Sequence, residues 1–178
     1  MLVSERLILR PIEEKDLRAI KGWKNDPEIK KSLGGFSYGF SEKDIISWYK
    51  NRPKNDYRWA IVVISTKKTI GFVGLYNIDQ ISHHAELGIL IGDKNAHGKN
   101  FASETTNTIL KFAFSEMNLH RIYLYVLGNN IAAIRVYEKN GFTCEGTLRQ
   151  HIYRDGQYNN YIVMGILRDE YEKNTRLK

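Results

Sequence analysis

The feature that most constrains this chain is a strand, a small polar turn and a helix that follow one another between residues 87 and 105. The apolar run 87–91 predicts a strand, and the sequence from Ser103 predicts a helix. The turn between them includes His97-Gly98-Lys99-Asn100-Phe101-Ala102. A turn that enters a helix directs unpaired backbone N–H groups and the positive end of the helix dipole at one point. Many such turns bind nothing, but one that binds a ligand usually holds a pyrophosphate.

Length and composition indicate one domain. A chain of 178 residues with 42% hydrophobic and 26% charged residues suits a single soluble domain, which we assign to residues 1–178. The longest uninterrupted apolar run, 60–64, is too short to cross a membrane. Residues 1–10 carry Glu5, Arg6 and Arg10 where a signal peptide would be apolar, so we expect a cytoplasmic protein.

Charge and cysteine content narrow the classes of function. Lys and Arg number 27 against 20 Asp and Glu, and the net charge of +7 favours anionic ligands. The basic residues are dispersed along the chain, so a nucleic-acid partner is not favoured. The single cysteine, Cys144, excludes an internal disulfide and a cysteine-based zinc site, and we expect it to be buried. The adjacent His83 and His84 would point to opposite faces of a strand, so we predict no metal site.

The hydrophobic pattern predicts strands and helices in the order βαα, βββ, αβ, αββ. Strands are predicted over 4–10, 59–64, 70–79, 85–91, 121–127, 142–153 and 158–167. Helices are predicted over 13–25, 28–32, 103–117 and 130–140, with another that begins at a Ser41/Asp44 capping box. Asp155-Gly156 predicts a hairpin, and we expect the tail 173–178 to be frayed. The order implies an α/β domain around a mixed sheet of six to seven strands, mostly antiparallel and flanked by helices.

Two further segments connect the turn to a known family. Residues 130–142 carry the spacing Asn-x-x-Ala-x-x-x-Tyr-x-x-x-Gly-Phe, and residues 85–89 read Ala-Glu-Leu-Gly-Ile. Together with the turn they resemble the GNAT superfamily of acetyl-CoA-dependent N-acetyltransferases, and the resemblance covers nearly the whole chain. The hairpin 145–156 is similar to that of the ribosomal-protein and spermidine N-acetyltransferase branch. The resemblance implies a single GNAT-like domain with a V-shaped cleft that binds acetyl-CoA as co-substrate.

The turn departs from the family pattern at two positions. His97 stands where the family usually has Gln or Arg, and Asn100 stands where it has Gly. Asn is the best substitute for Gly where the backbone must be left-handed, so we expect the turn geometry and cofactor binding to be kept. His97 is equally well explained as a phosphate contact and as a surface histidine without a role.

The resemblance also implies roles for residues along the cleft. Tyr137 matches the tyrosine that protonates the CoA thiolate, although a tyrosine in this helix could instead serve only core packing. Asn130 is implied to hydrogen-bond the pantetheine arm and could also cap its helix. The cofactor contacts implied in this way are Ile89, Leu90, Ile91, His97, Gly98, Lys99, Asn100, Phe101, Ala102, Ser103, Asn130 and Arg135.

An amine must lose its proton before it attacks a thioester, so the reaction needs a base at neutral pH. We expect Glu86 to be this base, acting through a water, because strand 85–91 should line the cleft. Alternation places Glu86 and Leu90 on one face, although Glu86 could also lie on a solvent-exposed face. Trp23, Asn25, Phe36 and Tyr38 lie in the segment that forms the acceptor wall in this family, but packing explains the aromatic residues equally well.

The acceptor remains open. A protein N-terminus, a polyamine, and an amino sugar or other small metabolite are all compatible with the chemistry. The net charge of +7 weighs against a polycation and permits a ribosome-docked or nucleotide-linked acceptor. The competing function is a module that binds CoA with little turnover, and a homodimer is possible. Nucleic acid is not an expected partner, and neither is a membrane.

Overall fold

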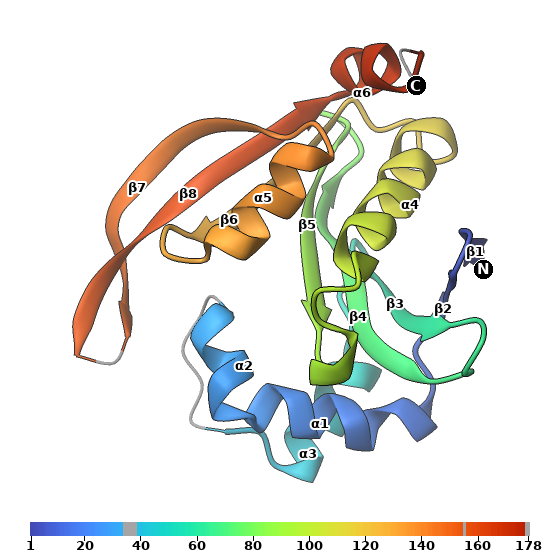
Figure 1. Ribbon diagram of the computed structural model, residues 1–178, viewed down its shortest axis with the longest axis vertical. Helices are drawn as coiled ribbons and strands as arrows, with labels where there is room; N and C mark the ends of the chain where they lie inside the picture. Colours follow the sequence, from blue (N-terminus) through green and yellow to red (C-terminus); the bar gives the residue numbers. More distant parts are fainter. Residues whose placement is uncertain (34–38, 155, 177–178) are drawn as a thin grey trace.

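The computed structural model describes residues 1–33, 39–154 and 156–176, in which helices cover both faces of one mixed sheet (Figure 1). The eight strands lie in the order β1-β2-β3-β4-β5-β6-β8-β7. They are β1 Leu2–Val3, β2 Leu7–Pro11, β3 Tyr57–Val63, β4 Thr69–Asp79, β5 His84–Ile91, β6 Arg121–Leu127, β7 Thr143–Arg154 and β8 Gln157–Leu167. The helices are η1 Glu14–Asp16, α1 Leu17–Asn25, α2 Pro27–Ser32, α3 Glu42–Lys50, η2 Lys94–Ala96, α4 Phe101–Ser115, α5 Ile131–Lys139 and α6 Arg168–Arg176.

Local sequence signals set where several helices begin. The predicted capping box at the start of α3 is present, because the Ser41 side chain accepts from the Asp44 backbone N–H and the Asp44 carboxylate accepts in return. Asp26 caps α2, with Pro27 at the first helical position. Asn130 Oδ1 accepts from the Ala133 backbone N–H at 3.2 Å and caps α5, as predicted.

The sheet has a hydrophobic core on each face. The larger core packs strand residues such as Leu75, Leu87 and Leu124 against α4 residues that include Ile109 and Leu110, all nearly inaccessible to solvent. The smaller core lies under α1, α2 and α3, where one buried isoleucine of each helix packs near β3, β4 and β5: Ile20, Ile29 and Ile45. The larger core therefore fixes β5 and α4, which carry the predicted anion site.

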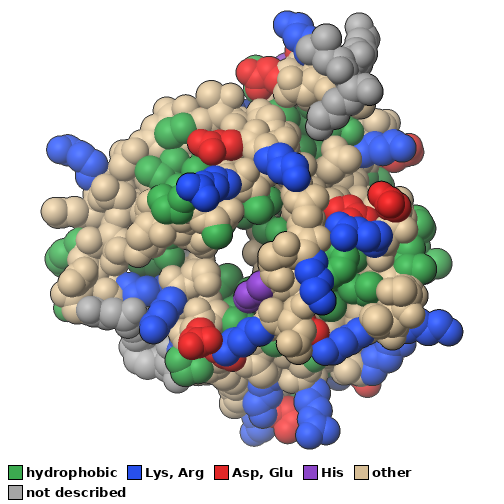
Figure 2. All heavy atoms as spheres, viewed as in Figure 1, with side chains coloured by type: hydrophobic (Ala, Val, Ile, Leu, Met, Phe, Trp, Pro, Cys, Tyr) green, Lys and Arg blue, Asp and Glu red, His purple; other side chains and the backbone are tan. Residues whose placement is uncertain are grey.

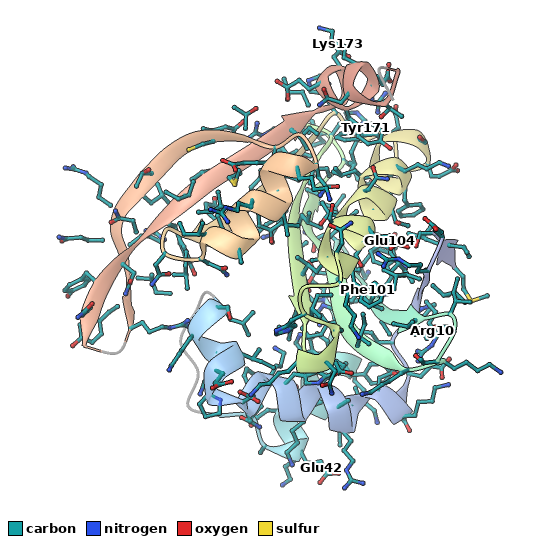
Figure 3. All side chains as sticks on the ribbon, in the orientation of Figure 1. Arg10, Glu42, Phe101, Glu104, Tyr171 and Lys173 are labelled. Atoms are coloured by element: carbon teal, nitrogen blue, oxygen red, sulfur yellow. The ribbon has the colours of Figure 1, made fainter. Side chains whose placement is uncertain are left out.

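Ion pairs attach the beginning of the chain to this frame. Glu104, in the first turn of α4, accepts hydrogen bonds from the Arg6 backbone N–H, the Arg6 guanidinium and the Ser4 hydroxyl. Figure 3 labels Glu104 together with Phe101, whose ring lies 4.6 Å from the Arg6 guanidinium carbon. Arg10 and the buried carboxylate of Asp16 form a two-bond ion pair at the start of α1.

The central feature of the sheet is the separation of β5 from β6. These strands are parallel and pair only at His84–Arg121, Ala85–Ile122 and Glu86–Tyr123. Beyond Glu86, β5 continues along β4 to Ile91, whereas β6 continues along β8. The two strands therefore form the V-shaped opening that the family resemblance implies, with Glu86 at its apex.

The structure corrects three expectations. The sheet has eight strands rather than six to seven, because the two-residue β1 also pairs. The tail expected to fray belongs largely to α6, whose Tyr171 ring packs against Phe114 with centroids 5.1 Å apart. Cys144 is exposed, because β7 is the outermost strand and most of its side chains face solvent. Asp155 of the predicted hairpin turn lies outside the described residues.

Candidate active site

A cavity of about 800 Å³ lies in the opening between β5 and β6. Its walls come from β5, the turn before α4 and the start of α4, one side of α5, the end of β6 and the last turn of α2. The predicted residues on this wall are Glu86, Ile89, Leu90, Ile91, His97, Gly98, Asn100, Phe101, Ala102, Asn130 and Tyr137. Segments far apart in the sequence thus meet at one place, and most of the predicted site residues meet there as well.

The turn before α4 has the backbone geometry predicted for an anion site. Asn100, the N-cap of α4, has a left-handed backbone with φ 64°, and Gly98 has φ 73°. The Asn100 side chain does not cap the helix; its Oδ1 accepts from Lys139 Nζ at 3.0 Å instead. His97 Nε2 lies 2.8 Å from the Ile91 carbonyl oxygen and joins the turn to the end of β5. Asn100 therefore has the left-handed backbone that we expected at this position, where the family usually has Gly.

The unpaired edge of β5 and the N-terminus of α4 together suit an extended ligand such as a pantetheine arm. The edge of β5 beyond Glu86 is not paired with β6, so the backbone groups that face away from β4, apart from the Ile91 carbonyl that His97 contacts, can pair with a ligand that adds like a strand. The N-terminus of α4 supplies unpaired N–H groups close to this edge. An added side chain at Gly98 would meet nothing within 4 Å, so the turn leaves open space beside it.

Tyr137 lies on the inner side of α5, with 7% of its surface exposed and its ring 5.7 Å from that of Phe142. Burial raises the pKa of Tyr137 to about 12. The phenol therefore stays protonated at neutral pH and can donate a hydrogen bond into the cavity that it lines. Tyr137 therefore both packs in the core and lines the cavity.

Glu86 is half-buried at the apex of the opening. Burial raises the pKa of its carboxyl group, and the nearby charge of Asp56 acts in the same direction. Asn77 opposes this effect by donating from Nδ2 to Glu86 Oε2 at 3.1 Å. A carboxylate with a raised pKa in a cavity is a suitable proton acceptor for an amine.

Aromatic side chains lie beside Glu86 and on the cavity wall. The Tyr76 ring lies across Gly74 and Gly88. A Cβ atom at either glycine would come within 3 Å of this ring, so only glycine leaves room for it. On β6, the Tyr123 and Tyr125 rings meet edge-on at 5.9 Å, and Tyr125 also contacts Tyr161 of β8 at 6.1 Å. This wall places flat, electron-rich surfaces next to a carboxylate, an arrangement that suits a cationic amine.

Polar contacts join α2 to the opposite side of the cavity. Asn130 Nδ2 donates to the Ser32 carbonyl at 3.1 Å. Arg154, near the tip of the β7–β8 hairpin, donates to the carbonyls of Lys30 and Leu33. These bonds hold carbonyls at the end of α2, where the Lys30 carbonyl also accepts from the Leu33 backbone N–H at 3.2 Å. Figure 2 shows the result as an opening through the molecule, bounded by the hairpin, α5, β5 and α2.

Several predicted residues lie away from the cavity wall. Ser103 is buried and accepts from Asn140 Nδ2 at 2.9 Å, while Lys99 and Arg135 are exposed. The Trp23 ring packs over Gly92, and the Asn25 amide forms two hydrogen bonds with the Phe40 backbone. Phe36 and Tyr38 lie outside the described residues.

Sequence patterns did not indicate several residues that line or support the cavity: Ile29, Ser32, Leu33, Asn77, Tyr125 and Tyr161. The residues of α2 were expected as a helix but not as a wall of the site. Tyr125 and Tyr161 alternate within strands, a pattern that fits a sheet face equally well whether or not it lines a cavity. Asn77 carried no signal, because its contact with Glu86 depends on how β4 bends.

Comparison with known proteins identifies the family. A family model described as an acetyltransferase (GNAT) domain matches residues 6–143. The chain belongs to the GNAT acetyltransferase family. It is 34% identical to the spermidine N(1)-acetyltransferase of Vibrio cholerae serotype O1 over 175 residues, which cover 95% of this chain and 97% of that relative. It is also 33% identical to the uncharacterized N-acetyltransferase YoaA of Bacillus subtilis strain 168, over 88% of this chain and 90% of the relative.

The solved structures agree with this assignment. The crystal structure of spermidine N-acetyltransferase from Vibrio cholerae in complex with CoA and spermine superposes with a TM-score of 0.86 at 31% identity, and covers 95% of this chain and 99% of that one. The predicted GNAT fold is therefore confirmed, and so is the class of activity: this protein is an N-acetyltransferase with acetyl-CoA as co-substrate. No helix in the described part of the chain is long and apolar enough to span a membrane.

Proposed function

We propose that this GNAT enzyme acetylates a primary amine of a small molecule by direct attack on the thioester, with Glu86 as the base and Tyr137 as the acid. The observation that carries the proposal is that both side chains line one cavity, reached from β5 and from α5. The proposal is supported by the free edge of β5 and the left-handed turn, which fit the acetyl-CoA side of such a reaction.

Each residue has one step to perform. Glu86 accepts the proton that the attacking amine gives up, directly or through one water, and its raised pKa makes it a stronger base than a free glutamate. Backbone N–H groups on the free edge of β5 stabilise the negative oxygen that forms when the amine adds to the carbonyl. Tyr137 donates a hydrogen bond to the departing thiolate sulfur; with a pKa of about 12, it stabilises the thiolate without full proton transfer.

A polyamine such as spermidine is the first acceptor to test. Two observations support it: the similarity to the spermidine N(1)-acetyltransferase of Vibrio cholerae and the aromatic wall of Tyr123, Tyr125 and Tyr161. Aromatic faces attract ammonium groups, and a flexible amine could extend along such a wall toward Glu86.

Two observations favour a second class of acceptor, an amine with a single positive charge or an attached anionic group. Among the described residues that line the cavity, Glu86 is the only one with a carboxylate. The whole chain has a net charge of +7, which disfavours a polycation at long range. A nucleotide-linked amino sugar or a peptide N-terminus would suit both a cavity with one carboxylate and a chain with a net positive charge.

A thiol-release assay with acetyl-CoA tests the proposal and separates the acceptors. The panel contains spermidine, a monoamine, short peptides with free N-termini and a nucleotide-linked amino sugar. We expect turnover with at least one of them, and the ratio of kcat/KM values identifies the class. Tight acetyl-CoA binding without turnover of any amine would support a CoA-binding module instead.

Glu86→Gln tests the base. We expect kcat to fall by roughly 10²-fold near pH 7, with a smaller loss as the pH approaches the amine pKa of about 10.4, because the free amine then needs no base. Glu42→Gln is the matched control, since Glu42 lies at the start of α3, far from the opening (Figure 3), and should leave the rate unchanged. An equal loss at every pH would remove Glu86 from the role of base.

A further inference from the structure

Asn77 occupies an irregular position in β4 next to Glu86. The register between β4 and β5 shifts between Tyr76 and Asp79, so Asn77 lies in a bulge with a left-handed backbone at φ 51°. Few residues other than Gly, Asn and Asp adopt this conformation readily. The bulge turns the Asn77 side chain toward β5, where Nδ2 donates to Glu86 Oε2 at 3.1 Å.

The bulge is held by residues that precede and begin β3. The Asn77 backbone N–H donates to Asp56 Oδ1 at 3.3 Å, and the Ile78 N–H donates to the Asn55 carbonyl at 3.1 Å. Asp56 is 5% exposed and pairs with Arg58 at 2.9 Å. Arg58 in turn donates to the Trp48 carbonyl at 2.8 Å. A buried ion pair thus fixes the backbone of Asn77 in place and, through it, the side chain that reaches Glu86.

We infer that Asn77 is a positioning residue for the acetyl transfer: its amide holds one oxygen of the Glu86 carboxylate so that the other faces the amine. The inference rests on the proposed role of Glu86 as base. A carboxylate on a half-buried strand can rotate among several orientations, and one hydrogen bond to Oε2 selects among them. The same bond stabilises the ionised carboxylate against the burial that would otherwise keep it protonated.

Other groups also act on the Glu86 charge. Asp56, before β3, raises its pKa, and Arg58 lies beside Asp56 as the paired cation. The phenols of Tyr76 on β4 and Tyr123 on β6 have their own pKa values raised in part by the Glu86 charge. In this surrounding, Asn77 is the group whose hydrogen bond lowers the pKa of Glu86. Its removal should therefore raise that pKa.

Asn77→Gly tests the inference, because glycine keeps the left-handed backbone and removes only the amide. The pKa of Glu86 is measured in the free protein from the ¹³Cδ shift of labelled glutamate, with the Glu86 signal assigned by its absence in Glu86→Gln. We expect an upward shift of about half to one pH unit, and an equal shift of the acid side of the pH–rate profile. Asn77→Asp should shift it further, because a second carboxylate repels the first.

The matched control is Asn118→Gly. Asn118 also has a left-handed backbone, at φ 55°, and its Oδ1 accepts from Arg168 at 2.9 Å in the loop before β6, outside the cavity wall. This variant should leave both the pKa of Glu86 and the pH–rate profile unchanged.

The outcomes separate this inference from the proposed function. If the acid side of the profile disappears in Glu86→Gln but does not move in folded Asn77→Gly, Asn77 has no positioning role and Glu86 remains the base. If Glu86→Gln keeps the wild-type profile, the proposed base is wrong and the role of Asn77 is overturned with it. A shift in both the ¹³Cδ titration and the rate profile of Asn77→Gly supports the inference.

Discussion

The side of the cavity formed by β5 and α4 rests on the larger hydrophobic core, whereas the side formed by α2 rests on one buried isoleucine of the smaller core and a few polar contacts. Leu87 and Ile109 lie in that core with almost no exposed surface. The six-residue α2 buries only Ile29 and is joined to the opposite side by Asn130 and Arg154. Burial of this extent stabilises the fold by about 1.5–3 kcal/mol per apolar side chain, and a hydrogen bond contributes about 1 kcal/mol.

This difference indicates which side of the cavity tolerates movement and substitution. The β5 and α4 side carries the anion turn and cannot move without disturbing the main core. The α2 side can shift or vary in sequence with a small loss of stability, because Asn130 and Arg154 bond to backbone carbonyls of this segment rather than to particular side chains. We therefore expect acetyl-CoA binding to depend on the first side and acceptor choice to depend on the second.

The largest expected effect compares the two sides directly. Leu110→Ala, under α4, should lower the free energy of unfolding by about 2–5 kcal/mol, because a fully buried side chain leaves a cavity in a rigid core. Ile29→Ala should cost less than about 2 kcal/mol, because α2 can settle into the space. Urea unfolding followed by circular dichroism measures both. Equal losses would mean that α2 is as firmly held as α4.

Tyr137→Phe tests whether the core-supported side also carries the acid. We expect kcat to fall roughly 10²-fold, while the acetyl-CoA dissociation constant and the thermal stability stay nearly unchanged, because phenylalanine keeps the packing against Phe142. With the pKa of Tyr137 near 12, this residue should cause no change in rate between pH 6 and 10. Stopped-flow thiol detection and calorimetric titration provide the two measurements, and an unchanged kcat removes the acid role.

Arg154→Gln should give the smallest effect and addresses the α2 side alone. The guanidinium bonds to α2 carbonyls are lost, so the acceptor KM should rise a few-fold while the acetyl-CoA KM stays constant. The loss of stability should be about 1–3 kcal/mol, the usual cost of removing a hydrogen bond to a charged group. Arg149→Gln, an exposed residue of the same hairpin, is the control. Equal changes in both KM values would contradict the division of roles between the two sides.

The sequence predicted the first side of the cavity better than the second. The strand–turn–helix from β5 to α4 follows from local periodicity, and the left-handed Asn100 follows from the conformational preference of asparagine. The Arg154 contact with Lys30 joins residues 124 positions apart, and no local pattern encodes such a pair. The amide of Asn25 bonds to the Phe40 backbone by the same kind of long-range contact.

Two smaller differences have similar causes. Cys144 comes two residues after Phe142, at the start of a strand, and would be buried in a central strand, but β7 is the edge strand. The bulge at Asn77 depends on Asp56, a residue 21 positions earlier, so the link to Glu86 becomes visible only in the folded chain. Spacing motifs thus located the residues on the cavity wall, while the contacts that hold and orient them required three-dimensional information.

The opening between the hairpin, α5, β5 and α2 has a closed rim, and a closed rim restricts what can enter it. We expect the thioester arm of acetyl-CoA to enter end first from one mouth of the opening and a terminal amine to enter from the other. Both substrates would then be bound together, which favours a ternary complex over a ping-pong sequence. We expect an amine in the middle of a stiff chain not to reach Glu86, whatever its affinity for the surface.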